Sequence, residues 1–138
     1  MREIVFKAKR IDNSEWVEGS YLCCEGATTV SFQNEHYILV FDGYGVEYHA
    51  IDKNTICQYT GLKDKTGKMI WENDIIWYFD DLADKDKLDQ IRFNETHASF
   101  TRLHKSKMGL QYLHFDECLA NMCEVIGNIF DNADLLGE

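Results

Sequence analysis

Apolar and polar residues alternate along most of the chain, in short runs separated by glycine, asparagine and aspartate. Near the N-terminus, Ile4, Phe6 and Ala8 recur at the period of a half-buried β-strand. Later runs are rich in β-branched and aromatic residues, which favour a pleated surface. The pattern predicts strands at 4–9, 16–24, 28–32, 37–41, 46–49, 55–60, 69–71, 75–79, 90–93, 98–103, 110–115 and 124–130.

The order of these elements predicts the fold class, which is mainly β and best described as a β-rich α+β protein. We expect one domain over residues 1–138, with candidate subdomains at 1–57 and 58–138. The first subdomain would be a β-meander. The second would be a central hairpin followed by a small SH3-like barrel, because five short strands, a bend and a short helix before the last strand are typical of that fold.

Two short helical segments are expected near the C-terminus. The carboxylate of Asp116 is placed to cap the first of them by accepting from the amide of Cys118 or Leu119. Residues 132–136 would form one last helical turn that docks two leucines.

The central hairpin is predicted from its turn residues. The sequence of residues 64–67 is Asp-Lys-Thr-Gly, which places a glycine where a tight turn uses a left-handed residue. A short apolar strand, residues 69–71, follows the turn. Glu72, Asn73 and Asp74 then interrupt the apolar pattern before a second run at 75–79. The backbone is therefore expected to bend at residues 72–74 and to begin a new strand.

This central stretch, residues 58–76, resembles the signature of the YopX family, small proteins encoded mostly by prophages and their relatives. Residues 2–9 and 125–132 are similar to the opening and closing strands of that family. The residues that carry the signature are Gln58, Tyr59, Thr60, Gly61, Asp64, Gly67, Trp71, Glu72, Asn73, Asp74, Gly127 and Asn128.

Two departures from the family pattern bear on the backbone. Asn73 stands where the family usually has glycine, and asparagine is the next-best residue for a left-handed conformation. The chain also contains no proline, so other residues must set the turns where the family tends to carry one. The resemblance implies a fold and a mobile-element setting. It implies no catalytic residues, because the family has no established activity.

The composition limits the cellular setting and the partners. The chain has 24 acidic and 14 basic residues, and the resulting net charge of -10 opposes non-specific binding to nucleic acid. An odd number of cysteines, with Cys23 and Cys24 adjacent, is a poor disulfide framework and indicates reduced thiols. No apolar run is long enough to span a bilayer. We expect an acidic, cytoplasmic protein of a bacterial host, without membrane contact.

Two residue groups offer metal ligands. The aspartates between residues 80 and 89 supply oxygens for a divalent cation, although a solvated acidic loop is the favoured interpretation because lysines are interspersed. These aspartates are Asp80, Asp81, Asp84, Asp86 and Asp89. The second group has zinc-compatible types at loose spacing and no Cys-x-x-Cys pair, so buried small side chains are favoured. Its members are Cys57, His114, Cys118 and Cys123. No cofactor is expected.

Catalytic and nucleic-acid alternatives have weaker support. His36, His49, His97 and His104 are scattered, so no pair for nucleophilic attack can be assembled from the sequence. Glu72 and Asp74 offer an acid and base pair, but a structural role in the bend is favoured.

Two basic strands with interleaved aromatics would place Arg92 and Arg102 on one barrel face, the way single-stranded nucleic acid is gripped. Solvated outward faces are the favoured explanation. The candidate interaction surface comprises Trp71, Trp77, Arg92, Phe100 and Arg102.

The leading functional hypothesis is a non-enzymatic, self-assembling interaction module that docks a protein partner. Many short strands expose edges, and three tryptophans and seven tyrosines suit interfaces. A nucleic-acid accessory factor or an acidic DNA mimic is the alternative. A metal-dependent hydrolase or nuclease that uses the aspartate loop is a weaker one.

Overall fold

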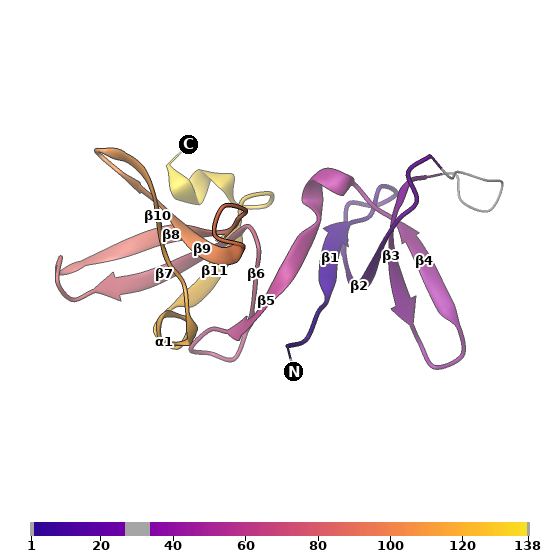
Figure 1. Ribbon diagram of the computed structural model, residues 1–138, viewed down its shortest axis with the longest axis horizontal. Helices are drawn as coiled ribbons and strands as arrows, with labels where there is room; N and C mark the ends of the chain where they lie inside the picture. The colour runs from indigo at the N-terminus through magenta and orange to yellow at the C-terminus, as the bar shows by residue number, and fades with distance from the viewer. Residues whose placement is uncertain (1, 27–33, 138) are drawn as a thin grey trace. The chain divides into compact units, whose positions relative to one another are not determined.

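The computed structural model describes residues 2–26 and 34–137, and it confirms the mainly β class (Figure 1). The chain divides into two compact units, residues 1–59 and 60–138. The strand expected at 28–32 lies outside the described residues. None of the helices in the described ranges is long or apolar enough to cross a bilayer.

The first unit is an antiparallel meander with strand order β4-β3-β2-β1-β5. Its buried core consists of Ala8, Ile38 and Ile51, with partly buried apolar side chains around them. Gly19 permits close approach of the strands, because a Cβ there would lie 2.1 Å from the carbonyl oxygen of Leu39. The elements are β1 (Phe6–Lys9), β2 (Trp16–Cys23), β3 (His36–Phe41), β4 (Val46–Ala50), the 3-10 helix η1 (Lys53–Thr55) and β5 (Cys57–Lys63).

The second unit contains the predicted hairpin and a five-stranded antiparallel sheet of order β10-β9-β8-β7-β11. Strand β6 pairs with β5 to form the hairpin. The other elements are β6 (Met69–Trp71), β7 (Asp74–Asp80), β8 (Lys85–Asn94), β9 (Ser99–Ser106), β10 (Gly109–His114), α1 (Glu117–Ala120), β11 (Glu124–Asn128) and the 3-10 helix η2 (Ala133–Leu136).

The five-stranded sheet does not close into a barrel within the described residues. Strands β10 and β11 form its two edges, and β11 pairs with β7 alone. The chain leaves β10 through α1, which packs its Ala120 and Leu119 into the core, and then returns beside β7 at the far edge. The predicted SH3-like barrel is therefore wrong as to closure, because among the described strands β11 pairs with β7 and not with β10, and the second unit is an open antiparallel sheet.

Both predicted helical segments are confirmed. The carboxylate of Asp116 caps α1 by accepting from the amide of Leu119 at 3.0 Å, because that amide has no partner inside the helix. At the C-terminus, η2 carries Leu135 and Leu136, which are both half-buried.

Candidate functional sites

The turn of the central hairpin is organised by the carboxylate of Asp64, which is almost fully buried. One oxygen accepts from the amide and hydroxyl of Thr66 and from the amide of Lys68, at 2.7–3.0 Å. The other oxygen accepts from the amide of Val125 in β11 at 2.9 Å. Burial alone would raise the pKa of Asp64, but these hydrogen bonds outweigh it and hold the pKa below its ordinary value. One side chain thus ties the turn to a strand 61 residues away.

The bend after β6 is also built from backbone hydrogen bonds. Asp74 accepts from the amide of Trp71 at 2.8 Å through its carboxylate, as the structural interpretation of this acid expects. Asn73 has φ 71°, so the left-handed conformation predicted for it is confirmed. Its amide donates to the carbonyl of Ile91 at 2.7 Å, and its carbonyl accepts from the amide of Ile129 at 3.1 Å. The bend therefore joins β8 to the segment after β11.

The other signature residues also lie at backbone junctions. Gly61 and Gly67 have φ of 88° and 87°, and Gly127 follows a register shift where a Cβ would meet the side chain of Asn132. The hydroxyl of Thr60 donates to the carbonyl of Ile70 at 2.7 Å, across the hairpin. Gln58 pairs with Phe6 in the ladder between β5 and β1, Tyr59 is buried, and Glu72 is half-buried. Asn128 accepts from the amides of Phe130 and Asp131 after β11.

The aspartates expected in one solvated loop are divided among two strands and a turn: Asp80 ends β7, Asp81 and Asp84 lie in the turn, and Asp86 and Asp89 lie in β8. Only residues 81–84 connect β7 to β8, and Asp89 lies within β8 with no exposed surface. Its carboxylate contacts Arg102 at 3.1 Å and Nδ1 of His104 at 2.6 Å. The loop prediction is wrong for Asp89 because the partners that hold it come from β9.

Arg102 connects this buried cluster to its surroundings. Its guanidinium also donates to the Tyr78 hydroxyl at 2.9 Å and to the His114 carbonyl at 2.7 Å. Burial, together with neighbouring Asp89, raises the pKa of Tyr78. The adjacent cleft of about 340 Å³ is lined by Tyr78, Arg102, Lys87 and Asp80, among others, and Lys87 and Asp80 form an ion pair at 2.5 Å. The charges here neutralise one another, which is the arrangement of a structural network.

The five residues of the candidate interaction surface do not form one surface. Ile91 is the cross-strand partner of Arg102, and Arg92 is that of Thr101, so Arg92 and Arg102 lie on opposite faces of the sheet. The prediction that both arginines share one face is therefore wrong, because the observed register pairs Arg102 with the residue before Arg92. Phe100 packs against the core, and Trp71 is 4% exposed. Trp77 is half-buried, with the Lys65 ammonium 4.6 Å from its ring centroid.

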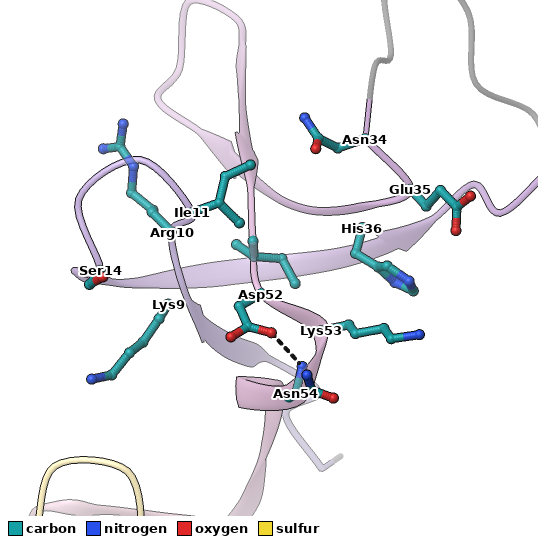
Figure 2. Close-up of a pocket in the computed structure, with 11 residues that line it drawn as sticks. Lys9, Arg10, Ile11, Ser14, Asn34, Glu35, His36, Asp52, Lys53 and Asn54 are labelled. Carbon is teal, nitrogen blue, oxygen red and sulfur yellow. Dashed lines mark hydrogen bonds between the residues drawn. The ribbon is translucent and has the colours of Figure 1, made fainter.

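A wide cleft of about 620 Å³ lies in the first unit (Figure 2). Figure 2 shows the Asp52 carboxylate bonded to the amide of Asn54, 3.0 Å away, where it caps η1. Lys9, Arg10 and Lys53 line the cleft together with Glu35 and Asp52. Cations and anions are mixed along its wall, so the cleft has no single sign of charge with which to select a ligand.

The hairpin of β3 and β4 exposes apolar side chains at the edge of the first sheet. Phe41 and Val46 are cross-strand partners, and so are Leu39 and Tyr48, which places all four on one face. Phe41 is 68% exposed and Tyr48 is 51% exposed, and Tyr44 at the hairpin tip is fully exposed. This cluster was not selected from the sequence, although its aromatic and β-branched residues were recognised as strand formers.

The zinc-compatible residues considered from the sequence are not gathered in the described part of the structure. Among the described residues, the group of His, Cys and acidic side chains close enough to share an ion is instead Cys23, Glu25 and His36. Cys123 and Cys57 are buried, and burial raises the pKa of the Cys123 thiol to about 11. The expected burial of small side chains is confirmed for Cys57 and Cys123 and is wrong for Cys118, which is exposed.

Comparison with known proteins places these features in a family. Residues 5–137 match the family model described as YopX protein, so the chain belongs to the YopX family and the resemblance is confirmed. No curated protein matches the chain significantly. The fold is similar to the crystal structure of protein EF1440 from Enterococcus faecalis, with a TM-score of 0.57 and 22% identity over 99% of each chain.

Proposed function

We propose that this protein is a non-enzymatic interaction module of a phage or prophage, which self-associates through β4 and docks a protein partner through its second sheet. The observation that carries the proposal is the exposed apolar face of the β3–β4 hairpin, formed by Leu39, Phe41, Val46 and Tyr48. Exposed aromatic and branched side chains beside a sheet edge are typical of surfaces that pair with another chain.

Strand β4 is suited to strand addition. It stands at the end of the first sheet's strand order, and its sequence, Val-Glu-Tyr-His-Ala, contains no lysine or proline. Edge strands that must stay unpaired usually carry such residues, because a lysine or proline blocks the approach of another strand. The edge of this sheet thus lacks lysine and proline, and Glu47 is its acidic residue.

A second copy of the chain is the occupant that best complements this edge. In antiparallel pairing about a two-fold axis at Tyr48, each Glu47 would lie opposite His49 of the other copy, and each Val46 opposite Ala50. The carboxylate of Glu47 would then face an imidazole, and the apolar side chain of Val46 would face the apolar side chain of Ala50. Repulsion between two chains of net charge -10 opposes the dimer, so association should strengthen as salt screens it.

Sedimentation velocity over a range of protein concentrations tests the self-association. The wild type should show a concentration-dependent dimer. Tyr48→Lys should be monomeric, because two ammonium groups would meet at the axis. Tyr112→Lys is the matched control, since Tyr112 is 55% exposed on β10, the edge strand of the other sheet. A wild type that stays monomeric at all concentrations, or a dimer that Tyr48→Lys leaves intact, would refute the proposal.

The protein partner is assigned to the β9–β10 hairpin of the second unit. Met108 and Leu110 are exposed there, and Lys105 and Lys107 supply positive charge on an otherwise acidic chain. These features favour a partner with an apolar strand flanked by acids. Capture from a bacterial lysate should succeed with wild type and Tyr48→Lys and fail with Tyr112→Lys. Equal capture by all three proteins would contradict this assignment.

The other functional hypotheses have less support from the geometry. Arg102 is engaged by Asp89, Tyr78 and the His114 carbonyl, which leaves Arg92 as the exposed member of the basic pair. Asp80 is similarly engaged by Lys87 and by backbone amides. Arg102, Asp80 and Asp89 are thus used for internal contacts, so they are not presented to nucleic acid or a metal ion.

A further inference from the structure

The ends of β2 and β3 bring a thiol and an imidazole together on one face of the first sheet. Cys23 and His36 are direct cross-strand partners, so their side chains project from the same face. Glu25 follows β2 closely, and its carboxylate lies 3.1 Å from Nε2 of His36. One oxygen, one nitrogen and one sulfur atom of this group all lie within 4.8 Å of one another.

Tyr21 fixes the orientation of the imidazole. Its hydroxyl lies 2.6 Å from Nδ1 of His36, and the two rings are stacked with centroids 5.9 Å apart and planes within 6°. A phenol oxygen can accept from Nδ1–H, which leaves the Nε2 lone pair directed toward Glu25 and Cys23.

We propose that Cys23, Glu25 and His36 form a binding site for Zn²⁺, with Tyr21 as the residue that positions the imidazole. Zinc accepts sulfur, nitrogen and oxygen ligands together, and three protein ligands leave a fourth tetrahedral position for water. On binding, the Cys23 thiol releases its proton to solvent and the sulfur becomes a thiolate ligand. The imidazole of His36 carries its proton on Nδ1 and donates a hydrogen bond from there to the Tyr21 oxygen. Metal-bound histidines usually make such a bond through their second ring nitrogen.

An ordinary surface ion pair explains less of this arrangement. An ion pair between His36 and Glu25 accounts for those two residues alone. It does not account for the Cys23 thiol near both of them or for the Tyr21 hydroxyl at the second ring nitrogen. The adjacent Cys24 is directed elsewhere, because its Sγ lies 3.4 Å and 3.5 Å from the carbonyl oxygens of Asn34 and Glu35. Cys24 therefore provides a control that matches Cys23 in residue type and nearly in position.

Zinc titration against a chromophoric chelator, in the presence of a phosphine reductant, tests the site. The wild type should bind one equivalent of Zn²⁺, and Co²⁺ in its place should give a thiolate-to-metal charge-transfer band. Cys23→Ser should lose the band and bind zinc at least about tenfold more weakly. Cys24→Ser and Cys118→Ser should match the wild type. Binding that is equal in wild type and Cys23→Ser, or lost equally in Cys24→Ser, would overturn the proposal.

The positioning role of Tyr21 needs a separate readout. Tyr21→Phe keeps the stacked ring and removes the hydroxyl, so zinc affinity should fall about tenfold while one equivalent still binds with the thiolate band. Glu25→Gln, at an exposed position, should also weaken binding without unfolding the chain. Thermal unfolding of each metal-free variant would reveal a folding defect. Unchanged affinity in Tyr21→Phe would remove Tyr21 from the site.

Discussion

The two units of this protein use the same kind of antiparallel sheet in different ways. The second unit buries a cluster of apolar residues and encloses the charged pair of Asp89 and Arg102 within one sheet. The first unit buries fewer apolar residues and exposes Phe41 and Tyr48 at its edge. The difference indicates that the second unit supplies most of the stability, whereas the first carries the surface that we propose for self-association. Substitutions in the two units should therefore separate unfolding from assembly.

The largest effect on stability is expected at Asp89. Asp89→Ala would leave the guanidinium of Arg102 buried without its carboxylate, and removal of one partner of a buried pair costs about 3–5 kcal/mol. Denaturant unfolding would measure the change. Asp86→Ala, on the exposed part of the same strand, is the control and should change the free energy of unfolding by about 0.5 kcal/mol or less. Similar values for both would show that the cluster adds little.

A smaller loss is expected at Asp64. Asp64→Asn would place an amide donor near amides that also donate, and should lower the free energy of unfolding by about 2 kcal/mol at neutral pH. Because the folded state lowers the pKa of Asp64, its contribution is full above the unfolded pKa and is lost as pH falls through the folded pKa. The difference between wild type and variant should therefore shrink as the pH falls below the ordinary pKa of aspartate. A difference that is constant with pH would contradict the role assigned to the carboxylate.

The stability of the bend at Asn73 should depend on how readily the residue there adopts a left-handed backbone conformation. Asn73→Ala puts alanine at φ 71°, where its Cβ is strained and no polar side chain compensates. The free energy of unfolding should fall by about 1–2 kcal/mol. Asn73→Gly should cost less, because glycine adopts this conformation freely, although the bond from Gln90 is lost. Urea unfolding of the two variants gives the order. Greater stability of the alanine variant would argue against a left-handed bend.

The smallest effect on stability is expected at the first sheet's edge. Tyr48→Lys at low protein concentration should change the free energy of unfolding by about 0.5 kcal/mol or less, because Tyr48 is half exposed. Dilute thermal unfolding would check this. A large loss of stability in the monomer would mean that Tyr48 serves the fold of its own chain, and the contrast between the two units would weaken.

Local backbone features could be predicted from the sequence because their causes lie within a few residues. The turn at residues 64–67, the left-handed Asn73 and the Asp116 cap depend on side chains that act on nearby amides. The family resemblance was likewise carried by one long continuous stretch, residues 58–76, and the family match over residues 5–137 agrees with it.

Features that depend on strand register could not be predicted in the same way. Asp89 follows closely on a run of charged residues, 84–87, that indicates a solvated loop, yet its partners are Arg102 and His104 on the next strand. The faces of Arg92 and Arg102 depend on a pairing offset that no local pattern states. Cys23 and His36 come together by the same kind of pairing, so the metal ligands considered from sequence spacing did not include this set.

Oxidative cross-linking at position 48 tests the self-association most directly. In a background where Cys23, Cys24 and Cys118 are serine, Tyr48→Cys should form a disulfide-linked dimer, because antiparallel self-pairing brings opposed Cα atoms to about 4.5–5.5 Å. Glu47→Cys should not, because each copy of it would lie opposite residue 49 and too far from its own counterpart. Cross-linking at Tyr48→Cys alone would support the two-fold pairing of β4. Equal cross-linking of both variants, or of neither, would contradict it.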